Sequence, residues 1–512
     1  MMGRNCGQID LFDSMIFERL IPKNHLLIKI DFIIDFSFVY DLIKDKYSHT
    51  TGRQSKDPVM MLKICLLEYL YNLSDIEVVS RIGTDVAFRW FLGLNLDDDV
   101  PDDTTISHFR AKRLGEETFE NFFTEIVKKC IEKDLVKTKR FMIDSTDVAA
   151  NVNYPSDKKL LCNAFRKVIK EIDNFNPTLA SQQLQSFEVD IEQEYNQNDK
   201  VSLKKYLEIA DRHLGYIYLK TYDQLQINQR YNEAFGILHD IIYQYSNDTK
   251  DKIVSCVDPD ARIAHKSPGN IKKGYKDHII VDEDSEIILS SIQTPFNVGD
   301  EKVLCGLVDK VSVNLELKPE EISADKVYGT IENRVFLKDN NMTANISFYN
   351  ESNRKLAVFG IKDFNISEDL KTVTCPNGIS TNKYSVLRNK SNDKEDYHFR
   401  FDKKACLKCP HVEKCLRKNK NGKYLVRKVE ISSRYDVVLD GLKRNQTVAF
   451  KEALNKRYKV ERRFATMVRN HGLRRCRFLK LAGAKIHITL ANMACNIVRM
   501  VNLLTPSSFA MS

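Results

Sequence analysis

Apolar residues recur at helical spacing through most of the first 137 residues of the chain. Asp57 followed by Pro58 is a typical helix start, in which the carboxylate caps the helix and proline occupies its first turn. Residues 74–77 form a capping-box pattern. Apolar side chains at intervals of three and four residues fill the segment 119–131. The pattern therefore predicts a helical N-terminal domain over residues 1–137.

One of these predicted helices is strongly basic. It carries His108, Arg110, Lys112 and Arg113 within six residues. Such a face could contact DNA, or it could be a solvated surface, which is the commoner use of charged helix faces. The sequence leaves both interpretations open.

Short apolar runs predict β-strands in the middle of the chain. One run ends at Asp144, and another, far downstream, ends at Asp325. Between them, the runs 274–281 and 287–292 flank a polar turn and predict a hairpin. Strands interspersed with helices predict an α/β core with a mixed sheet, in which the hairpin supplies the antiparallel part.

The composition is that of an ordinary globular protein with an excess of positive charge. The 512 residues carry a net charge of +9, which suggests a polyanionic partner. No run of 18 apolar residues is present, so we expect no membrane span. The N-terminus lacks the apolar core of a signal peptide, and most of the 12 cysteines sit in apolar segments, as expected in a reducing cytoplasm.

Asp144 and Asp325 are the first candidates for chemistry. An aspartate at a strand end often only caps a turn, and this interpretation stays open for Asp144. In an open α/β sheet, however, strand ends meet at one edge, where sites form. Two carboxylates there repel each other unless a proton or cation lies between them. Mg²⁺ is the natural cation, because it is a hard ion that takes oxygen ligands.

A third candidate lies in a very basic segment near the C-terminus. Residues 456–485 contain eleven basic side chains, and Glu461 is their one acidic neighbour. A helix with this charge would repel itself without a bound polyanion. Glu461 could pair with Arg457, four residues earlier, or it could ligate a metal beside a DNA backbone.

The blocks around these three acids resemble, in order, the DDE transposases of bacterial insertion sequences. Residues 141–146 resemble the first strand of that family, 258–262 with 274–276 its central region, 324–328 its second-aspartate block, and 457–461 with 471–475 its C-terminal signature. The N-terminal helices are also similar to those of the family. Val327, Leu454 and Val468 depart from the family's usual residues, and the last two of these concern how DNA strand ends are held.

This resemblance implies an RNase-H-like catalytic domain over residues 138–505. The polar, helix-prone block 155–250 would be a helical insertion in it, and residues 350–435 would be a cysteine-containing insertion. Residues 1–137 would bind transposon ends. The implied fold class is thus an α/β, mixed-sheet core with a helical N-terminal domain and two insertions.

The resemblance also implies a mechanism. Asp144, Asp325 and Glu461 would hold two Mg²⁺ ions, for which Mn²⁺ can substitute, and these would support in-line displacement at phosphorus. Water would attack first and free a 3′-OH at the transposon end, and that 3′-OH would then attack target DNA. Transposon-end and target DNA would be bound by a homodimer in the bacterial cytoplasm, at the nucleoid. The side chains expected to contact DNA are Arg457, Arg462, Arg469, Arg474 and Arg475.

Four cysteines form a separate pattern. Cys375, Cys406, Cys409 and Cys415 have the spacing C-x30-C-x2-C-x5-C in charged, loop-like surroundings. The spacing suits a small zinc-stapled insertion, in which His411 could replace one cysteine. Free reduced thiols are the alternative in a cytoplasmic protein.

Three functions remain compatible with the sequence. The first is an active transposase, the second a DNA-binding protein derived from a transposase without catalysis, and the third a metal-dependent nuclease without strand transfer. The presence of all three acids disfavours the second.

Overall fold

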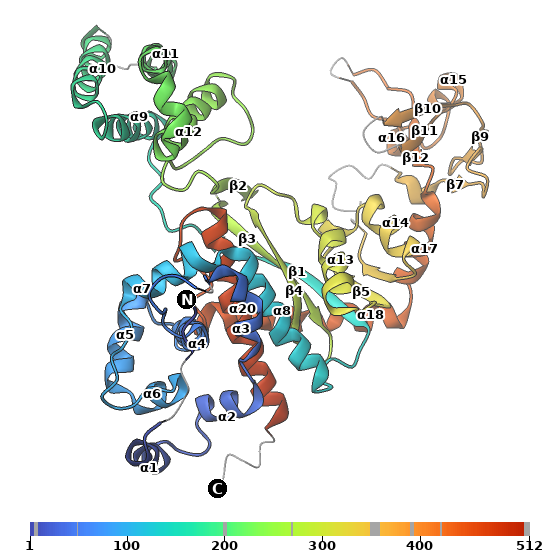
Figure 1. Ribbon diagram of the computed structural model, residues 1–512. Helices are drawn as coiled ribbons and strands as arrows, with labels where there is room; N and C mark the ends of the chain where they lie inside the picture. Colours follow the sequence, from blue (N-terminus) through green and yellow to red (C-terminus); the bar gives the residue numbers. More distant parts are fainter. Residues whose placement is uncertain are drawn as a thin grey trace. The chain divides into compact units, whose positions relative to one another are not determined.

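Contacts within the chain divide it into two compact units. Unit 1 comprises Met1–Lys318 with Tyr458–Ser512, and unit 2 comprises Pro319–Arg457. The computed structural model describes residues 1–4, 9–48, 50–197, 202–267, 270–348, 359–389, 394–419 and 422–505. Both units contain helices and strands (Figure 1), which fits the α/β class predicted from the sequence.

The first part of unit 1 is built from helices, and no strand occurs among its described residues. The predicted helix starts are confirmed. Asp57 Oδ1 accepts a hydrogen bond from the backbone N–H of Val59 at 2.6 Å, and Ser74 with Glu77 forms a complete capping box. The helices are α1 (Leu11–Leu20), α2 (Leu26–Ile33), α3 (Phe38–Ile43), α4 (Pro58–Leu70), α5 (Asp75–Thr84), α6 (Val86–Leu92), α7 (Asp103–His108), the π-helical η2 (Phe109–Leu114) and α8 (Glu116–Glu132).

The C-terminal helix α20 (Lys480–Leu504) forms the centre of unit 1. It contacts α2, α4 and α8 as well as the strands β3 and β4 described below, and most of its side chains between Ala484 and Val501 are buried. Among the described residues it is the one helix long and apolar enough to cross a membrane. A helix that is apolar all round and buried in this way is typical of a protein core.

Polar contacts fix the N-terminal helices to the C-terminal segment. The Tyr69 hydroxyl on α4 lies 2.8 Å from Nδ1 of His487 on α20, and Nδ1 of His471 lies 2.9 Å from the carbonyl oxygen of Tyr69. Arg477 donates to the carbonyl of Leu73 and stacks over the Tyr69 ring. Segments about 400 residues apart in sequence therefore share one core.

The sheet of unit 1 is antiparallel. Strand β3 (Asn270–Asp282) pairs with β1 (Arg140–Ala149), with β2 (Arg262–Ser267) and with β4 (Ile288–Pro295). The predicted hairpin is confirmed as β3–β4, and α13 (Leu304–Leu315) packs against both of its strands. The prediction that the first strand ends at Asp144 is wrong, because pairing with β3 continues to Ala149. The cross-strand partners, not the apolar run, set the length of β1.

Gly274 permits the close approach of β3 to the end of β1. Its φ is +129°, and a Cβ there would lie 2.4 Å from the carbonyl oxygen of Val148 and 2.5 Å from the backbone nitrogen of Ala150. Any other residue would clash with the backbone and strain the chain. This explains the glycine in the block 274–276.

A carboxylic acid, Asp277, is completely buried between β3 and α20. Its Oδ2 accepts a hydrogen bond from Nδ2 of Asn492 at 3.3 Å. Burial in an apolar setting disfavours the charged form and raises the pKa of Asp277 to about 7. The folded protein therefore holds a proton there at a pH at which the unfolded chain has released it.

Asp277 should make the folded state less stable as the pH rises. Between about pH 4 and about pH 7 the unfolded chain is ionised at this position and the folded chain is not, so the free energy of unfolding falls by about 1.4 kcal/mol per pH unit. Asp277→Asn removes this dependence. The difference in thermal midpoint between this variant and the wild type should grow from pH 5 to pH 7. A difference that stays flat over this range for Asp277→Asn would contradict the assignment.

A four-helix segment of unit 1 has its own apolar core. The helices α9 (Asp157–Asp173), α10 (Pro177–Gln197), α11 (Leu203–Ile227) and α12 (Gln229–Ser246) pack against one another. Phe165 and Phe187 stack face to face at 3.9 Å in that core. The helical block predicted over 155–250 is helical in the structure.

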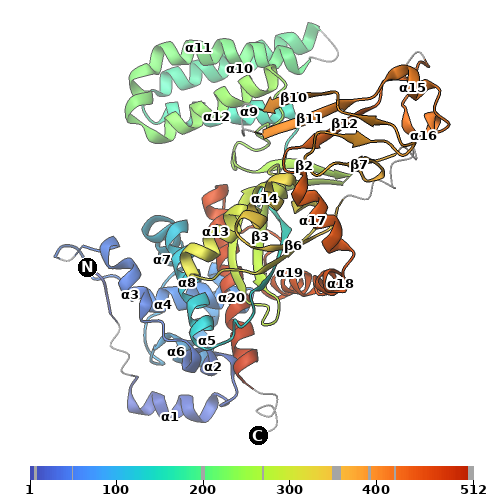
Figure 2. The same ribbon diagram turned by 90° about the vertical axis from the view of Figure 1, so that its right-hand side faces the viewer.

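Unit 2 begins with a parallel pair of strands. Strand β5 (Glu321–Ala324) pairs with β6 (Thr343–Ile346), with η4 (Lys326–Tyr328) and α14 (Ile331–Asp339) between them. The helices α17 (Tyr435–Asn445) and α18 (Val448–Asn455) pack against β6. Two small sheets follow the pair in sequence (Figure 2): β7 (Asn365–Ile366), β8 (Val373–Thr374) and β9 (Ser380–Thr381), and β10 (Tyr384–Asn389), β11 (Lys394–Arg400) and β12 (Lys428–Ser432), with α15 (Lys403–Leu407) and α16 (Val412–Cys415).

Candidate active site

Asp144 lies in the middle of β1 and is partly exposed. The residues before it, from Phe141 to Ile143, are buried, so the strand anchors it rigidly. Asp144 Oδ1 accepts a hydrogen bond from the backbone N–H of Ser145 at 2.8 Å. Strand alternation places Asp144 on the same face as Thr146 and on the opposite face from Asp147. An anchored, accessible carboxylate is suited to binding a cation.

Glu461 lies on α19 (Tyr458–Asn470), a helix that packs against β1. Val460, Phe464 and Met467 are buried on this helix, whereas Glu461 is exposed in its first turn. The chain after the helix is bonded to the end of β1, because Ala149 N–H donates to the carbonyl of Arg474 at 3.0 Å. Unit 1 therefore carries two of the three candidate acids on elements that contact each other.

Glu286 anchors α19 to the β3–β4 turn. Its carboxylate is 2 % exposed and lies within ion-pair distance of Arg462, Arg463 and Arg499, with Nε of Arg463 at 3.1 Å and Nη2 of Arg499 at 3.6 Å. Arg462 thus already has a carboxylate partner inside unit 1. Sequence reasoning missed Glu286, because nothing in the turn 282–286 signals that it would meet arginines 176 and more residues away.

Asp325 belongs to unit 2. It directly follows β5, as the sequence predicted, and its Oδ1 accepts from the backbone N–H of Lys326 at 2.7 Å. Nη1 of Arg457, in the same unit, lies 3.7 Å from Oδ1 of Asp325. Asp325 is partly exposed. Arg457, one of the side chains predicted to contact DNA, therefore lies beside one of the candidate metal ligands.

The other predicted DNA contacts are exposed in unit 1. Arg469 lies in the last turn of α19. Nη1 of Arg474 donates to the carbonyl of Asp147 at 3.3 Å, and Nε of Arg475 donates to Oδ1 of Asn151 at 2.9 Å. Both guanidinium groups keep further donors, so they can still bind phosphate.

His471 and Gly472 of the C-terminal signature have structural roles. His471 is buried against α4. Gly472 has a φ of +66°, and a Cβ there would lie 2.4 Å from Oδ1 of Asn72. These two residues position the chain that leads from α19 to Arg474 and Arg475.

A second polar cluster lies on the face of β1 opposite Asp144. The hydroxyl of Ser145 donates to Oδ2 of Asp300 at 2.8 Å, and Nζ of Lys276 lies 2.5 Å from Oδ1 of Asp300. The Lys276 ammonium and the Ser145 hydroxyl help to hold the pKa of Asp300 below its ordinary value despite its burial. Ser145 and Lys276 come from two of the blocks noted in the sequence, and the structure joins them through Asp300.

The acids of the block 258–262 also serve the fold. The Tyr275 hydroxyl donates to Oδ1 of the buried Asp258 at 2.5 Å. Asp260 Oδ2 accepts from the backbone N–H of Leu481 at 2.9 Å, at the start of α20. These contacts explain the acids without any catalytic role.

The basic N-terminal helix offers less charge to DNA than its sequence suggests. Arg110 is 4 % exposed and bonds Glu68 through both carboxylate oxygens, at 3.0 and 2.9 Å, and it also pairs with Asp75. Lys112 is exposed on the same short segment. The solvated-face interpretation is thus wrong for Arg110, which is a core residue.

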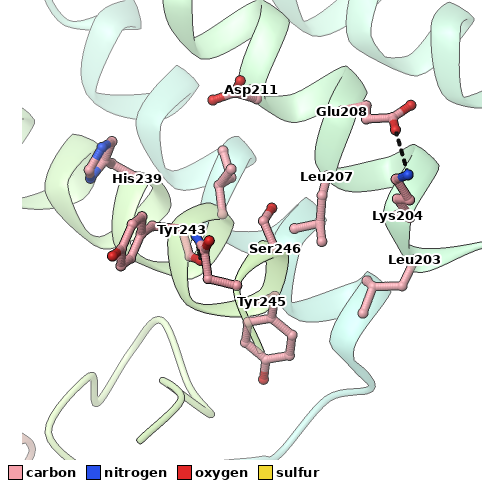
Figure 3. Close-up of a pocket in the computed structure, with 11 residues that line it drawn as sticks. Leu203, Lys204, Leu207, Glu208, Asp211, His239, Tyr243, Tyr245 and Ser246 are labelled. Carbon is pink, nitrogen blue, oxygen red and sulfur yellow. Dashed lines mark hydrogen bonds and ion pairs between the residues drawn. The ribbon is translucent and has the colours of Figure 1, made fainter. Parts of the chain in front are cut away.

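Unit 1 also contains a cavity between α11 and α12 (Figure 3). It measures about 510 Å³, and Leu203, Leu207 and Ile242 contribute apolar surface to it. Lys204 and Glu208 form an ion pair of 3.9 Å along its edge. No candidate catalytic acid lines this cavity, so it does not belong to the site considered above.

The described residues contain no group of three His, Cys, Asp or Glu side chains gathered closely enough to hold a metal ion. Asp144 and Glu461 lie in unit 1 and Asp325 lies in unit 2. The donor set itself consists of three carboxylates, two partly exposed and one exposed. It suits Mg²⁺, which takes oxygen ligands and keeps several waters.

Two protein-family models match the chain. Residues 15–112 match a transposase domain, DUF772, and residues 374–501 match a transposase DDE domain. The first match covers most of the N-terminal helices, and the second includes Glu461, all of α19 and most of α20. No solved structure matches the chain.

The DDE domain indicates a metal-dependent enzyme that cuts and transposes DNA. More narrowly, the two domains together support the function of a DNA transposase of an insertion sequence. Its substrate is therefore DNA.

Proposed function

We propose that Asp144, Asp325 and Glu461 are the catalytic acids and that they hold two Mg²⁺ ions in an RNase-H-like core. One observation carries this proposal. In unit 1, the accessible Asp144 lies on β1 and the exposed Glu461 lies on α19, a helix that contacts β1. Asp325 occupies the first position after β5, where its carboxylate is partly exposed. All three side chains supply only oxygen donors.

The chain's own residues would bind and orient the DNA in this mechanism. When bound, the two Mg²⁺ ions would stabilise the attacking and leaving oxygens of an in-line displacement at phosphorus. Arg457, which lies beside Asp325, would hold the phosphate of the cut strand. Water attacks the phosphodiester at the transposon end and a 3′-OH leaves. That 3′-OH then attacks a phosphodiester of target DNA, and a target 3′-OH leaves.

The domain roles follow the same proposal. Residues 1–137 would bind transposon ends, and residues 138–505 would form the catalytic domain, with the helical segment 155–250 and the cysteine-containing segment 350–435 as insertions. We propose that a homodimer brings two ends together and that the protein acts in the bacterial cytoplasm, at the nucleoid.

A strand-transfer assay tests the function directly. The protein is incubated with DNA that carries the ends of its own element, a target plasmid and Mg²⁺. Joined products support the transposase. Cut ends without joined products would instead support a nuclease, and binding without cutting would support an inactive DNA-binding protein. Replacing Mg²⁺ by Mn²⁺ should sustain the reaction, and excess EDTA should stop it.

Arg469 should contribute to DNA affinity but not to sequence preference. It is exposed near the end of α19, and a phosphate contact there releases counterions. Arg469→Ala should lower affinity for end and random DNA alike and reduce the slope of log K against log salt by about 0.9. Fluorescence anisotropy over a salt series measures both. Arg166→Ala, an exposed arginine of α9, is the matched control and should leave the slope unchanged. An equal change in both variants would argue against a specific phosphate contact.

A further inference from the structure

Unit 2 brings together four cysteines that are far apart in its sequence. Cys375 precedes Cys406 by 31 residues, yet both line one small pocket with Cys409 and Cys415. Cys406 interacts electrostatically with each of the other three thiols. The described residues contain no disulfide bond between them.

Each cysteine is presented by a tight turn or a very short helix. Cys375 starts a turn in which its carbonyl accepts from the N–H of Gly378 at 2.8 Å, and Gly378 has a φ of +80°. Cys406 and Cys409 flank the end of α15, and the backbone N–H of His411 points at Sγ of Cys409 from 3.4 Å.

All four cysteines line one small pocket. Its volume is about 30 Å³. Asp402 and Arg427 are its other charged lining residues. Asp402 caps α15 by accepting from the N–H of Ala405 at 3.0 Å, and Arg427 donates to the carbonyl of Phe359 at 2.7 Å. The four thiols line the pocket beside these two charged groups.

The strands and helices nearest to the cysteines are very short. Strands β7, β8 and β9 have two residues each, and α15 and α16 have five and four. Seven buried side chains form their core, and Cys375, Cys406 and Cys415 lie at its edge. Cores of this size are commonly completed by a structural metal. In the described structure the sulfurs stand too far apart to share an ion, so binding requires the turns to close inward.

We propose that Cys375, Cys406, Cys409 and Cys415 bind one structural Zn²⁺ ion that staples the small sheets of unit 2. Zinc is favoured because it accepts four sulfur ligands in a tetrahedral, closed site, whereas Mg²⁺ takes oxygen ligands. Binding releases the thiol protons as the four sulfurs become thiolates. This site is chemically separate from the carboxylates proposed for catalysis, and it involves no DNA.

Metal analysis of the purified full-length chain tests this proposal. The wild type, purified under reductant without added metal, should contain one zinc per chain by inductively coupled plasma mass spectrometry. Cys409→Ser should lose at least half of that zinc. Cys162→Ser, a partly buried cysteine on α9, should keep it. Asp144→Asn should also keep it, so loss of DNA cleavage in that variant and loss of zinc in Cys409→Ser report on different sites.

A second measurement uses only the wild type, so it tests the proposal even if Cys409→Ser fails to fold. Titrating the wild type with a mercurial thiol reagent should release one zinc as the cluster thiols react. Zinc-free wild-type protein, full zinc retention in Cys409→Ser, or a disulfide between two of the four cysteines after alkylation and mass spectrometry would each overturn the proposal.

Discussion

Asp144→Asn should reduce end cleavage and strand joining together, by roughly a thousandfold or more. If Asp144 is a metal ligand as proposed, its loss removes several kcal/mol of charge stabilisation from the transition state, and each 1.4 kcal/mol is a factor of ten in rate. Asparagine keeps the size of the side chain and can still accept from the N–H of Ser145. DNA affinity should therefore change little. Single-turnover cleavage at saturating protein measures the chemical step.

Asp147→Asn is the matched control for this prediction. Asp147 lies on the same strand but on the opposite face, where its carboxylate is 3.5 Å from Nζ of Lys272. Its replacement should leave cleavage within a few-fold of the wild type. Asp325→Asn should behave like Asp144→Asn. Wild-type cleavage in either Asp144→Asn or Asp325→Asn, with circular dichroism showing a folded protein, would refute the assignment of the catalytic acids.

Local sequence signals predicted the elements well. The caps at Asp57 and Ser74, the hairpin β3–β4 and the position of Asp325 directly after β5 all depend on residues within a few positions of one another. Helix caps and turns depend on residues that are close in sequence, so a single sequence is enough to predict them. The helix that carries Glu461 was predicted in the same way.

Long-range partners were not predictable. Nothing near Asp144 indicates that β1 continues to Ala149, because the reason is its register with Gly274 and Tyr275. Likewise, Glu286 looks like an ordinary turn residue in the sequence. In the structure it forms ion pairs with arginines from α19 and α20. Buried polar groups need partners, and those partners can come from anywhere in the chain. A single sequence shows that a buried polar group needs a partner, but it does not show which residue that partner is.

Arg110→Met should destabilise unit 1 by about 3–5 kcal/mol, because it leaves the carboxylate of Glu68 buried without its cation. Glu68 is fully buried on α4, and both of its oxygens accept from Nη1 of Arg110. The Arg110 guanidinium also lies 4.5 Å from the centre of the Phe478 ring, so it connects the N-terminal helices to the C-terminal segment. The thermal midpoint measured by circular dichroism should fall clearly. Lys112→Met, an exposed neighbour on the same segment, should change it little.

The double variant Glu68→Leu with Arg110→Met separates charge burial from lost packing. Replacing both members of a buried pair with apolar side chains is often neutral, whereas removing one is costly. The double variant should therefore recover most of the midpoint that Arg110→Met loses. If Arg110 instead faced DNA, Arg110→Met would fold normally and lose affinity for transposon ends, and adding Glu68→Leu would lower the midpoint further. The thermal midpoint and the DNA affinity should both be measured for the wild type, Arg110→Met and the double variant. Together they show whether Arg110 is a core residue or a DNA contact.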